Sequence, residues 1–136
     1  MILRQTSGIL RYSTDADDGW LVADLDPGLG AYYLALLPKH LGVRRGKYDT
    51  HCTIVRGGRD VPARLDAWGK HEGEVVTFDY EPVVRSSGLY YWLGILSIRF
   101  ENIRTELGLP LDNKAYASPP APFSKWFHTT IGNIKQ

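Results

Sequence analysis

Two short stretches of the sequence carry nearly the same pattern, and that pattern limits the backbone they can adopt. Residues 51–54 read His-Cys-Thr-Ile, and residues 128–131 read His-Thr-Thr-Ile. Each stretch lies in a run that predicts a β-strand, where neighbouring side chains point to opposite faces. The histidine and threonine of each stretch should therefore share one face, with the spacer and the isoleucine on the other.

Hydrophobic periodicity and turn residues predict a mixture of strands and helices. Strands are expected over residues 8–13, 20–24, 49–56, 74–80, 89–96 and 125–134. Helices are expected over residues 27–37, 61–70 and 97–107. Asp26 and Ser97 are suited to cap the first and last of these helices. The apolar run 32–37 is equally compatible with a strand, since periodicity cannot settle so short a segment. The acidic stretch 14–19 predicts a hairpin turn.

The last predicted helix has an apolar side and a polar side. Ile98, Ile103 and Leu107 supply the apolar side. Glu101 and Arg104 are three residues apart, which places them next to each other on a helix. We therefore expect these two side chains to form an ion pair on the surface.

Length and composition indicate one soluble domain that spans residues 1–136. A chain of this length can build its own hydrophobic core. The net charge of +1 gives no overall field that would attract duplex nucleic acid. The single cysteine, Cys52, excludes an internal disulfide and is typical of a reducing compartment. With neither a signal-peptide pattern nor a membrane-spanning run, we expect a cytoplasmic protein without a membrane partner.

The four polar side chains of the two stretches are suited to phosphodiester cleavage. One group must take a proton from the attacking oxygen and another must give a proton to the leaving oxygen. Histidine titrates near neutral pH, so His51 and His128 can serve as the acid and the base, in either order. The hydroxyls of Thr53 and Thr130 can donate hydrogen bonds to the non-bridging oxygens, where negative charge develops. This chemistry requires neither a metal ion nor a cofactor.

A metal site is not expected at these stretches. His51 and Cys52 are adjacent in a strand and point to opposite faces, so both cannot easily bind one ion. The chain also lacks the CxxC and HExxH spacings that are typical of zinc sites. The same opposite facing makes Cys52 a core residue rather than a nucleophile.

Aromatic and basic residues near the two stretches are candidates for substrate binding. Trp126 lies two residues before His128, so it should share the face of His128 and is suited either to stack on a base or to pack in the core. Further candidates are Tyr12, Tyr48, Tyr90, Tyr91, Trp92, Arg44, Arg45, Lys47, Arg56 and Lys125. Core packing is the alternative for the other aromatics, and a solvated position is the alternative for the cations. Asp49 is suited to orient His51 or to cap a loop, and His40 and His71 are expected to be exposed.

The paired stretches resemble the H-x-T/S-aliphatic motifs that name the 2H phosphoesterase superfamily. The second, extended as HTTIGNI over residues 128–134, is similar to the usual ending of this family. The spacer is usually apolar in the family, whereas here it is cysteine in one copy and threonine in the other. The resemblance implies a bilobal α+β fold with two antiparallel sheets around a central cleft, helices outside and metal-independent catalysis.

The resemblance also implies a class of substrate. Members of the superfamily act on 2′,3′-cyclic phosphates, on 2′–5′ linkages and on cyclic di- and oligonucleotides. The compact chain and the stretches YYLALLP and KYDTHCTIVRG look most like the phage anti-CBASS branch, whose nucleases degrade cyclic nucleotide signals in the host cytoplasm. The alternatives are an RNA-end 2′,3′-cyclic phosphodiesterase of LigT type and a non-catalytic nucleotide-binding sponge.

Overall fold

The computed structural model describes residues 1–13, 19–113 and 117–135. The strands are β1 (Arg4–Tyr12), β2 (Leu21–Leu25), β3 (His51–Val55), β4 (Val75–Tyr80), β5 (Arg85–Ser87), β6 (Tyr90–Leu96) and β7 (Phe127–Asn133). The helices are α1 (Pro27–Leu36) and α2 (Ile98–Glu106), and short 3₁₀ turns span Lys39–Leu41 and Leu65–Ala67. All but the last residue of the predicted turn 14–19 lies outside the described residues.

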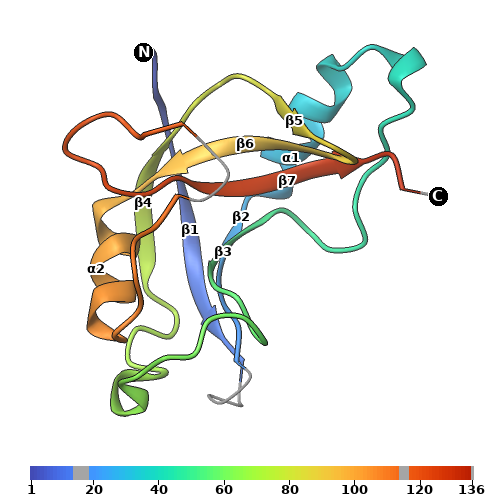
Figure 1. Ribbon diagram of the computed structural model, residues 1–136. Coiled ribbons are helices and arrows are strands. Elements are labelled where there is room, and N and C mark those ends of the chain that lie inside the picture. The colour runs from blue at the N-terminus through green and yellow to red at the C-terminus, as the bar shows by residue number, and fades with distance from the viewer. Residues whose placement is uncertain (14–18, 114–116, 136) are drawn as a thin grey trace.

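The strands form one antiparallel sheet that is nearly closed into a barrel. Its order is β3-β2-β1-β4-β6-β5, and β7 pairs with the other edge of β6. Only two residue pairs, Asp79–Leu96 and Tyr80–Ile95, join β4 to β6. The sheet curves so that β3 and β7, at its two ends, lie side by side (Figure 1). The predicted α+β class with antiparallel strands is confirmed, but the strands join in a single sheet rather than in two separate ones.

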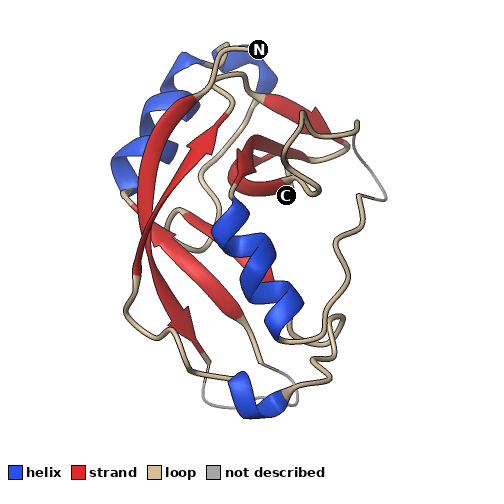
Figure 2. Ribbon diagram, turned by 90° about the vertical axis from the view of Figure 1, so that its left-hand side faces the viewer, coloured by secondary structure: helices blue, strands red, loops and turns tan. Residues whose placement is uncertain are grey.

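Local capping explains where the two helices begin. The carboxylate of Asp26 accepts a hydrogen bond from the backbone nitrogen of Gly28 at 2.9 Å, and Pro27 occupies the first helical position. The hydroxyl of Ser97 accepts one from the backbone nitrogen of Phe100 at 3.1 Å. Both predicted caps are confirmed, and residues 32–36 are helical rather than extended. Figure 2 shows the two helices well apart on the sheet.

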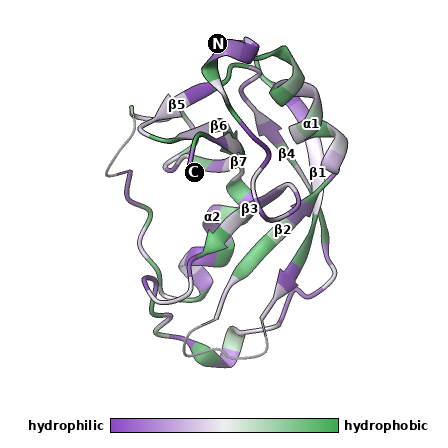
Figure 3. Cartoon of the chain, turned by 90° about the vertical axis from the view of Figure 1, so that its right-hand side faces the viewer, coloured by the Kyte–Doolittle hydropathy of each residue, from purple (hydrophilic) through white to green (hydrophobic). Residues whose placement is uncertain are grey.

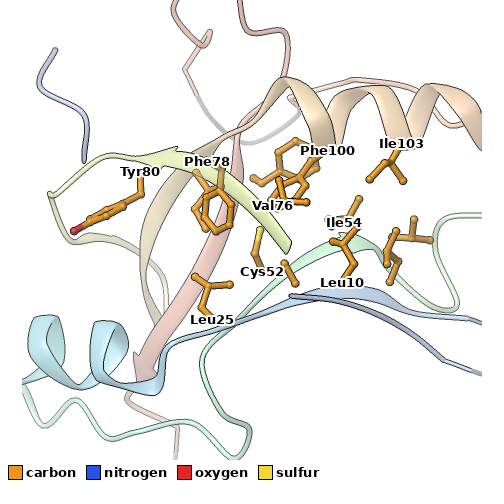
Figure 4. Packing of buried hydrophobic residues seen from close by; sticks show 14 of the residues in the cluster. Leu10, Leu25, Cys52, Ile54, Val76, Phe78, Tyr80, Phe100 and Ile103 are labelled. Atoms are coloured by element: carbon orange, nitrogen blue, oxygen red, sulfur yellow. The ribbon is translucent and has the colours of Figure 1, made fainter. Parts of the chain in front are cut away.

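The core lies between the inner face of the curved sheet and α2. The ring of Phe100 contacts Phe78 and Phe127, with ring centroids 5.1 and 5.5 Å apart. Cys52 and Ile54 of β3 are fully buried in the same cluster (Figure 4). Buried and exposed residues alternate in the second half of β1 and along β4, as expected for strands with one face in the core, whereas β2 is buried almost throughout. Figure 3 shows the hydropathy of each residue along these strands.

The predicted surface ion pair on α2 is wrong. Both side chains are buried, and they bind different partners. The carboxylate of Glu101 accepts hydrogen bonds from the backbone nitrogens of Ser124 and Lys125. Arg104 donates instead to β3 and to the chain that follows the helix. The segment after α2 folds back against the helix and covers these two polar side chains.

The helix predicted over residues 61–70 is also wrong, because only the 3₁₀ turn Leu65–Ala67 forms there. The backbone nitrogens of Ala63 and Arg64 both donate to the carbonyl of Leu107, at 3.0 and 3.1 Å. The indole nitrogen of Trp68 donates to the carbonyl of Ser13 at 3.1 Å. These long-range bonds hold the segment in an irregular path that its local sequence does not reveal.

Candidate functional site

The two His-x-Thr stretches form β3 and the middle of β7, and their side chains alternate as predicted. In β3, His51 and Thr53 are half-buried, whereas Cys52 between them is fully buried. In β7, His128 and Thr130 are exposed, with buried residues on either side of each. β3 and β7 contact each other, and the thiol of Cys52 lies beside the backbone of His128.

A cleft of about 870 Å³ opens over the side chains of both stretches. Thr53 from β3 and His128 and Thr130 from β7 line it. Of the described residues, those that line the cleft do not include His51, which begins β3. The cationic lining residues are Arg56, Arg59, Arg104 and Lys125, and the aromatic ones are Trp20, Tyr90, Trp92, Trp126 and Phe127. The cleft therefore combines positive charge with flat apolar surface, as a nucleotide site requires.

The chain just before β3 fixes the ring of His51. Its Nδ1 lies 2.8 Å from the backbone oxygen of Asp49. A carbonyl can only accept, so Nδ1 carries the proton and donates it, which leaves Nε2 for exchange with a substrate. The predicted orienting role of Asp49 thus falls to its main chain, because its carboxylate pairs with Arg45. The ring of Tyr48 stands edge-on to His51, with centroids 6.4 Å apart.

The surroundings of His128 favour its neutral form. Its ring reaches solvent in the cleft, yet the protein atoms packed around it desolvate it and lower its pKa. The positive charges of Lys125, Arg56 and His51 lower the pKa of His128 further. The ring of Trp92 packs edge-on against His128, with centroids 5.8 Å apart.

The lowered pKa of His128 predicts a dependence of stability on pH. In the unfolded chain this imidazole has its ordinary pKa of about 6.5. Below that pH the unfolded chain binds a proton that the folded chain does not, so the free energy of unfolding falls as the pH drops. In urea titrations between about pH 8 and about pH 5, the parent should lose stability relative to a His128→Gln variant. The relative loss cannot exceed about 1.4 kcal/mol per pH unit. A difference that stays constant over this range would contradict the prediction.

Lys125 brings a cation to the floor of the cleft. It is half-buried, and its Nζ donates to the backbone oxygen of Asp112 at 2.9 Å. Burial lowers the pKa of Lys125, and repulsion from Arg104 adds to that effect. The carboxylate of Glu101 and the amide of Asn113 bind the backbone of residues 124–126 and so hold Lys125 in position. An anion bound here would relieve the repulsion between the cations.

The other predicted binding residues are dispersed. Trp126 lines the cleft but is only 8 % exposed, so it does not share the exposure of His128. Its ring lies over Gly94, where an added Cβ would come within 2.7 Å of it, and this leaves little of the ring for stacking. Tyr12 is buried against Trp68, with ring centroids 5.0 Å apart, and lies outside the cleft lining.

Lys47 and Tyr48 precede β3 in the chain, and both lie outside the described lining of the main cleft. The Nζ of Lys47 stands 5.6 Å from the ring centroid of Tyr48. Arg56 lines the cleft as predicted. Arg44 serves the fold instead, since its backbone pairs with Asn133 of β7.

The structure confirms the expected exposure of one of the two remaining histidines and contradicts that of the other. His40 is exposed, as predicted. The exposed position predicted for His71 is wrong, because its side chain is only 12 % exposed. Its Nε2 lies 2.9 Å from the carboxylate of Glu106, and Arg99 donates to its Nδ1 at 3.1 Å. His71 therefore joins the loop before β4 to α2, away from the cleft.

Several cleft residues escaped the sequence analysis. They are Trp20, Arg59, Asp60, Ser87, Arg104, Asp112 and Asn113. They come from loops, strand ends and α2, so no periodic pattern connects them with the two motifs. Trp20, the first residue of a predicted strand, carried a signal as a large aromatic residue, and the structure leaves it 42 % exposed.

Comparison of the chain with protein-family models, curated proteins and solved structures found no match in any of the three. Within residues 1–13, 19–113 and 117–135, no group of three or more His, Cys, Asp or Glu side chains could hold a metal ion. The described part of the chain has no helix long and apolar enough to cross a membrane.

Proposed function

We propose that the protein is a 2H-type phosphodiesterase that cleaves cyclic di- or oligonucleotides without a metal ion. The observation that carries this proposal is the meeting of the two His-x-Thr strands at one cationic cleft. In this proposal the β3-β2-β1-β4 part and the β5-β6-β7 part of the sheet are the two lobes of the family's bilobal arrangement. The narrow link between β4 and β6 supports this division.

The proposed reaction begins with attack by a ribose 2′-hydroxyl on the neighbouring phosphodiester. His128 takes the proton from the 2′-oxygen while the new O2′–P bond forms. The bond from phosphorus to the leaving 5′-oxygen breaks, and His51 gives that oxygen a proton. Water then opens the 2′,3′-cyclic phosphate in the same site. We assign His128 as the base because its surroundings favour the neutral imidazole.

The remaining groups stabilise the charge that develops on the phosphate. The hydroxyls of Thr53 and Thr130 lie on the two strands that carry the histidines, so both can donate to the non-bridging oxygens. Arg56 and Lys125 lie close enough to His128 to influence its pKa, and their charges oppose the negative charge of the transition state. Tyr90 and Trp20, both more than 40 % exposed, offer surfaces on which bases can stack.

A substrate panel with mass analysis of the products tests the function. The panel contains 2′–5′ and 3′–5′ cyclic di- and trinucleotides and an RNA that ends in a 2′,3′-cyclic phosphate. We expect cleavage of at least one cyclic dinucleotide, through a 2′,3′-cyclic phosphate intermediate. We also expect the rate to be the same with and without EDTA. Cleavage only of the RNA end would replace the proposal with the LigT-type reaction.

Two further outcomes would overturn parts of the proposal. Binding of cyclic nucleotides with no cleavage of any panel member would make the protein a sponge. Loss of activity in EDTA that zinc restores would contradict the metal-free mechanism. Activity on cyclic dinucleotides would support a role in which a phage uses the protein to destroy CBASS signals.

A further inference from the structure

A second, smaller cavity lies beside the main cleft. Its volume is about 190 Å³, and it lies between α1, the segment that precedes β3, and β7. Ala31, Tyr48, Thr50, Thr130 and Ile131 are among the residues that line it. The proposed chemistry in the main cleft makes no use of this space.

The two cavities are neighbours at the second motif. Thr130 lines both of them, so a ligand bound at this side chain in the cleft lies next to the smaller cavity. Tyr48, on the wall of the smaller cavity, stands edge-on to His51. The smaller cavity therefore opens on the His51 side of the site, whereas the main cleft extends from His128.

The walls of the smaller cavity are held in place. Gly30 of α1 lies so close to Thr50 that an added Cβ would come within 2.5 Å of the threonine hydroxyl. At Gly132 of β7, an added Cβ would meet the backbone oxygen of Arg44 at 2.7 Å. These close approaches fix α1 and the segment before β3 against each other and against β7. The cavity is thus a built feature rather than a gap between loose loops.

The size and lining of the cavity suit one nucleobase. Its volume equals that of roughly six water molecules, which is too small for a whole nucleotide. Tyr48 is 71 % exposed and offers a ring face for stacking, and the hydroxyls of Thr50 and Thr130 can hydrogen-bond to base edges. Apart from Arg45, the rest of its lining is apolar, which matches the flat apolar faces of a base.

We propose that this cavity is a second subsite, which binds the base on the far side of the reacting phosphate from the base in the main cleft. The inference rests on the proposed function and adds a rule of selection to it. The protein would prefer ligands in which one phosphate joins two nucleosides over ligands that carry a single nucleoside.

Equilibrium binding tests the subsite independently of catalysis. The probes are a phosphorothioate cyclic diadenosine monophosphate, which resists cleavage, and adenosine 3′-monophosphate. Ala31→Phe should fill the cavity and raise the Kd of the dinucleotide about tenfold or more, with a change of less than about twofold for the mononucleotide. Tyr48→Leu should act in the same direction. Ala35→Phe is the matched control, since it adds the same ring one helical turn later, at an exposed position outside the cavity lining.

The result can overturn the inference in three ways. The parent could bind the dinucleotide no more tightly than the mononucleotide, Ala31→Phe could affect both probes equally, or Ala31→Phe could affect neither. A dinucleotide-specific effect of Ala31→Phe in a protein that never cleaves the unmodified dinucleotide would uphold the subsite and overturn only the proposed catalytic function.

Discussion

Replacement of His128 by alanine is expected to lower kcat/KM for cyclic dinucleotide cleavage by about 10²–10⁴-fold. The imidazole supplies the proton transfer at the attacking oxygen, and no other neutral base among the described cleft residues can take its place. His51→Ala should cost a similar factor, because the leaving oxygen would depart without a proton. The kcat/KM of the double variant should be only slightly lower than that of either single variant, since the two groups act as a unit. Steady-state kinetics on the purified variants measure these effects.

The matched control for the histidine variants is His40→Ala. His40 is an exposed histidine outside the described cleft lining, so its removal should leave kcat/KM unchanged. Thermal unfolding should show that all the variants remain folded, because His128 is exposed and His51 only half-buried. If either His51→Ala or His128→Ala cleaves as fast as the parent, the acid–base mechanism proposed here is wrong.

Replacement of Arg104 by methionine is expected to destabilise the protein by about 3–5 kcal/mol. Its side chain is only 4 % exposed, and its guanidinium donates to Asp60 at 3.0 Å and to the backbone oxygen of Ile54 at 2.8 Å. It also donates twice to the backbone oxygen of Pro110. Methionine keeps the volume but leaves a carboxylate and two carbonyls without this donor. Urea unfolding would measure the loss.

Asp60 provides a second measurement of the same change. Burial alone would raise the pKa of its carboxyl, but hydrogen bonds from Arg104 and from the backbone nitrogen of Arg56 lower it overall. In Arg104→Met, the pKa of Asp60 observed by NMR should therefore rise. The control is Arg64→Ala, an exposed arginine 3.8 Å from Asp66, which should cost no more than about 1 kcal/mol. If the two variants lost the same free energy of unfolding, the buried hydrogen bonds of Arg104 would contribute no more stability than an exposed ion pair.

The helix starts could be predicted because capping is a local property. Asp26 and Ser97 accept hydrogen bonds from backbone nitrogens two and three residues later, and the sequence contains all that this requires. The side chains of Glu101 and Arg104 show the limit of such reasoning. Their spacing gives their positions on one helix, but it says nothing about the segment that later covers them. A buried ion network and a surface ion pair look the same in that pattern.

The sequence by itself determined which side chains of each motif share a face. Alternation is a property of every extended backbone, so it needs no knowledge of neighbouring strands, and it separated Cys52 from His51 and Thr53 correctly. The same rule placed Trp126 on the face of His128, and both residues line the cleft. The ring of Trp126 packs there over Gly94, the cross-strand partner of His128, and this packing leaves it only 8 % exposed.

Only the tertiary structure decided that the two motifs meet. β3 and β7 come together because the sheet curves between them, through pairings such as Tyr80 with Ile95 that join distant parts of the chain. The same closure brings Arg104 of α2 and Lys125 to the cleft. Such contacts depend on how separate elements pack, and no local pattern of residues specifies them. The sequence thus determined the two faces, and the curvature of the sheet decided that they form one site.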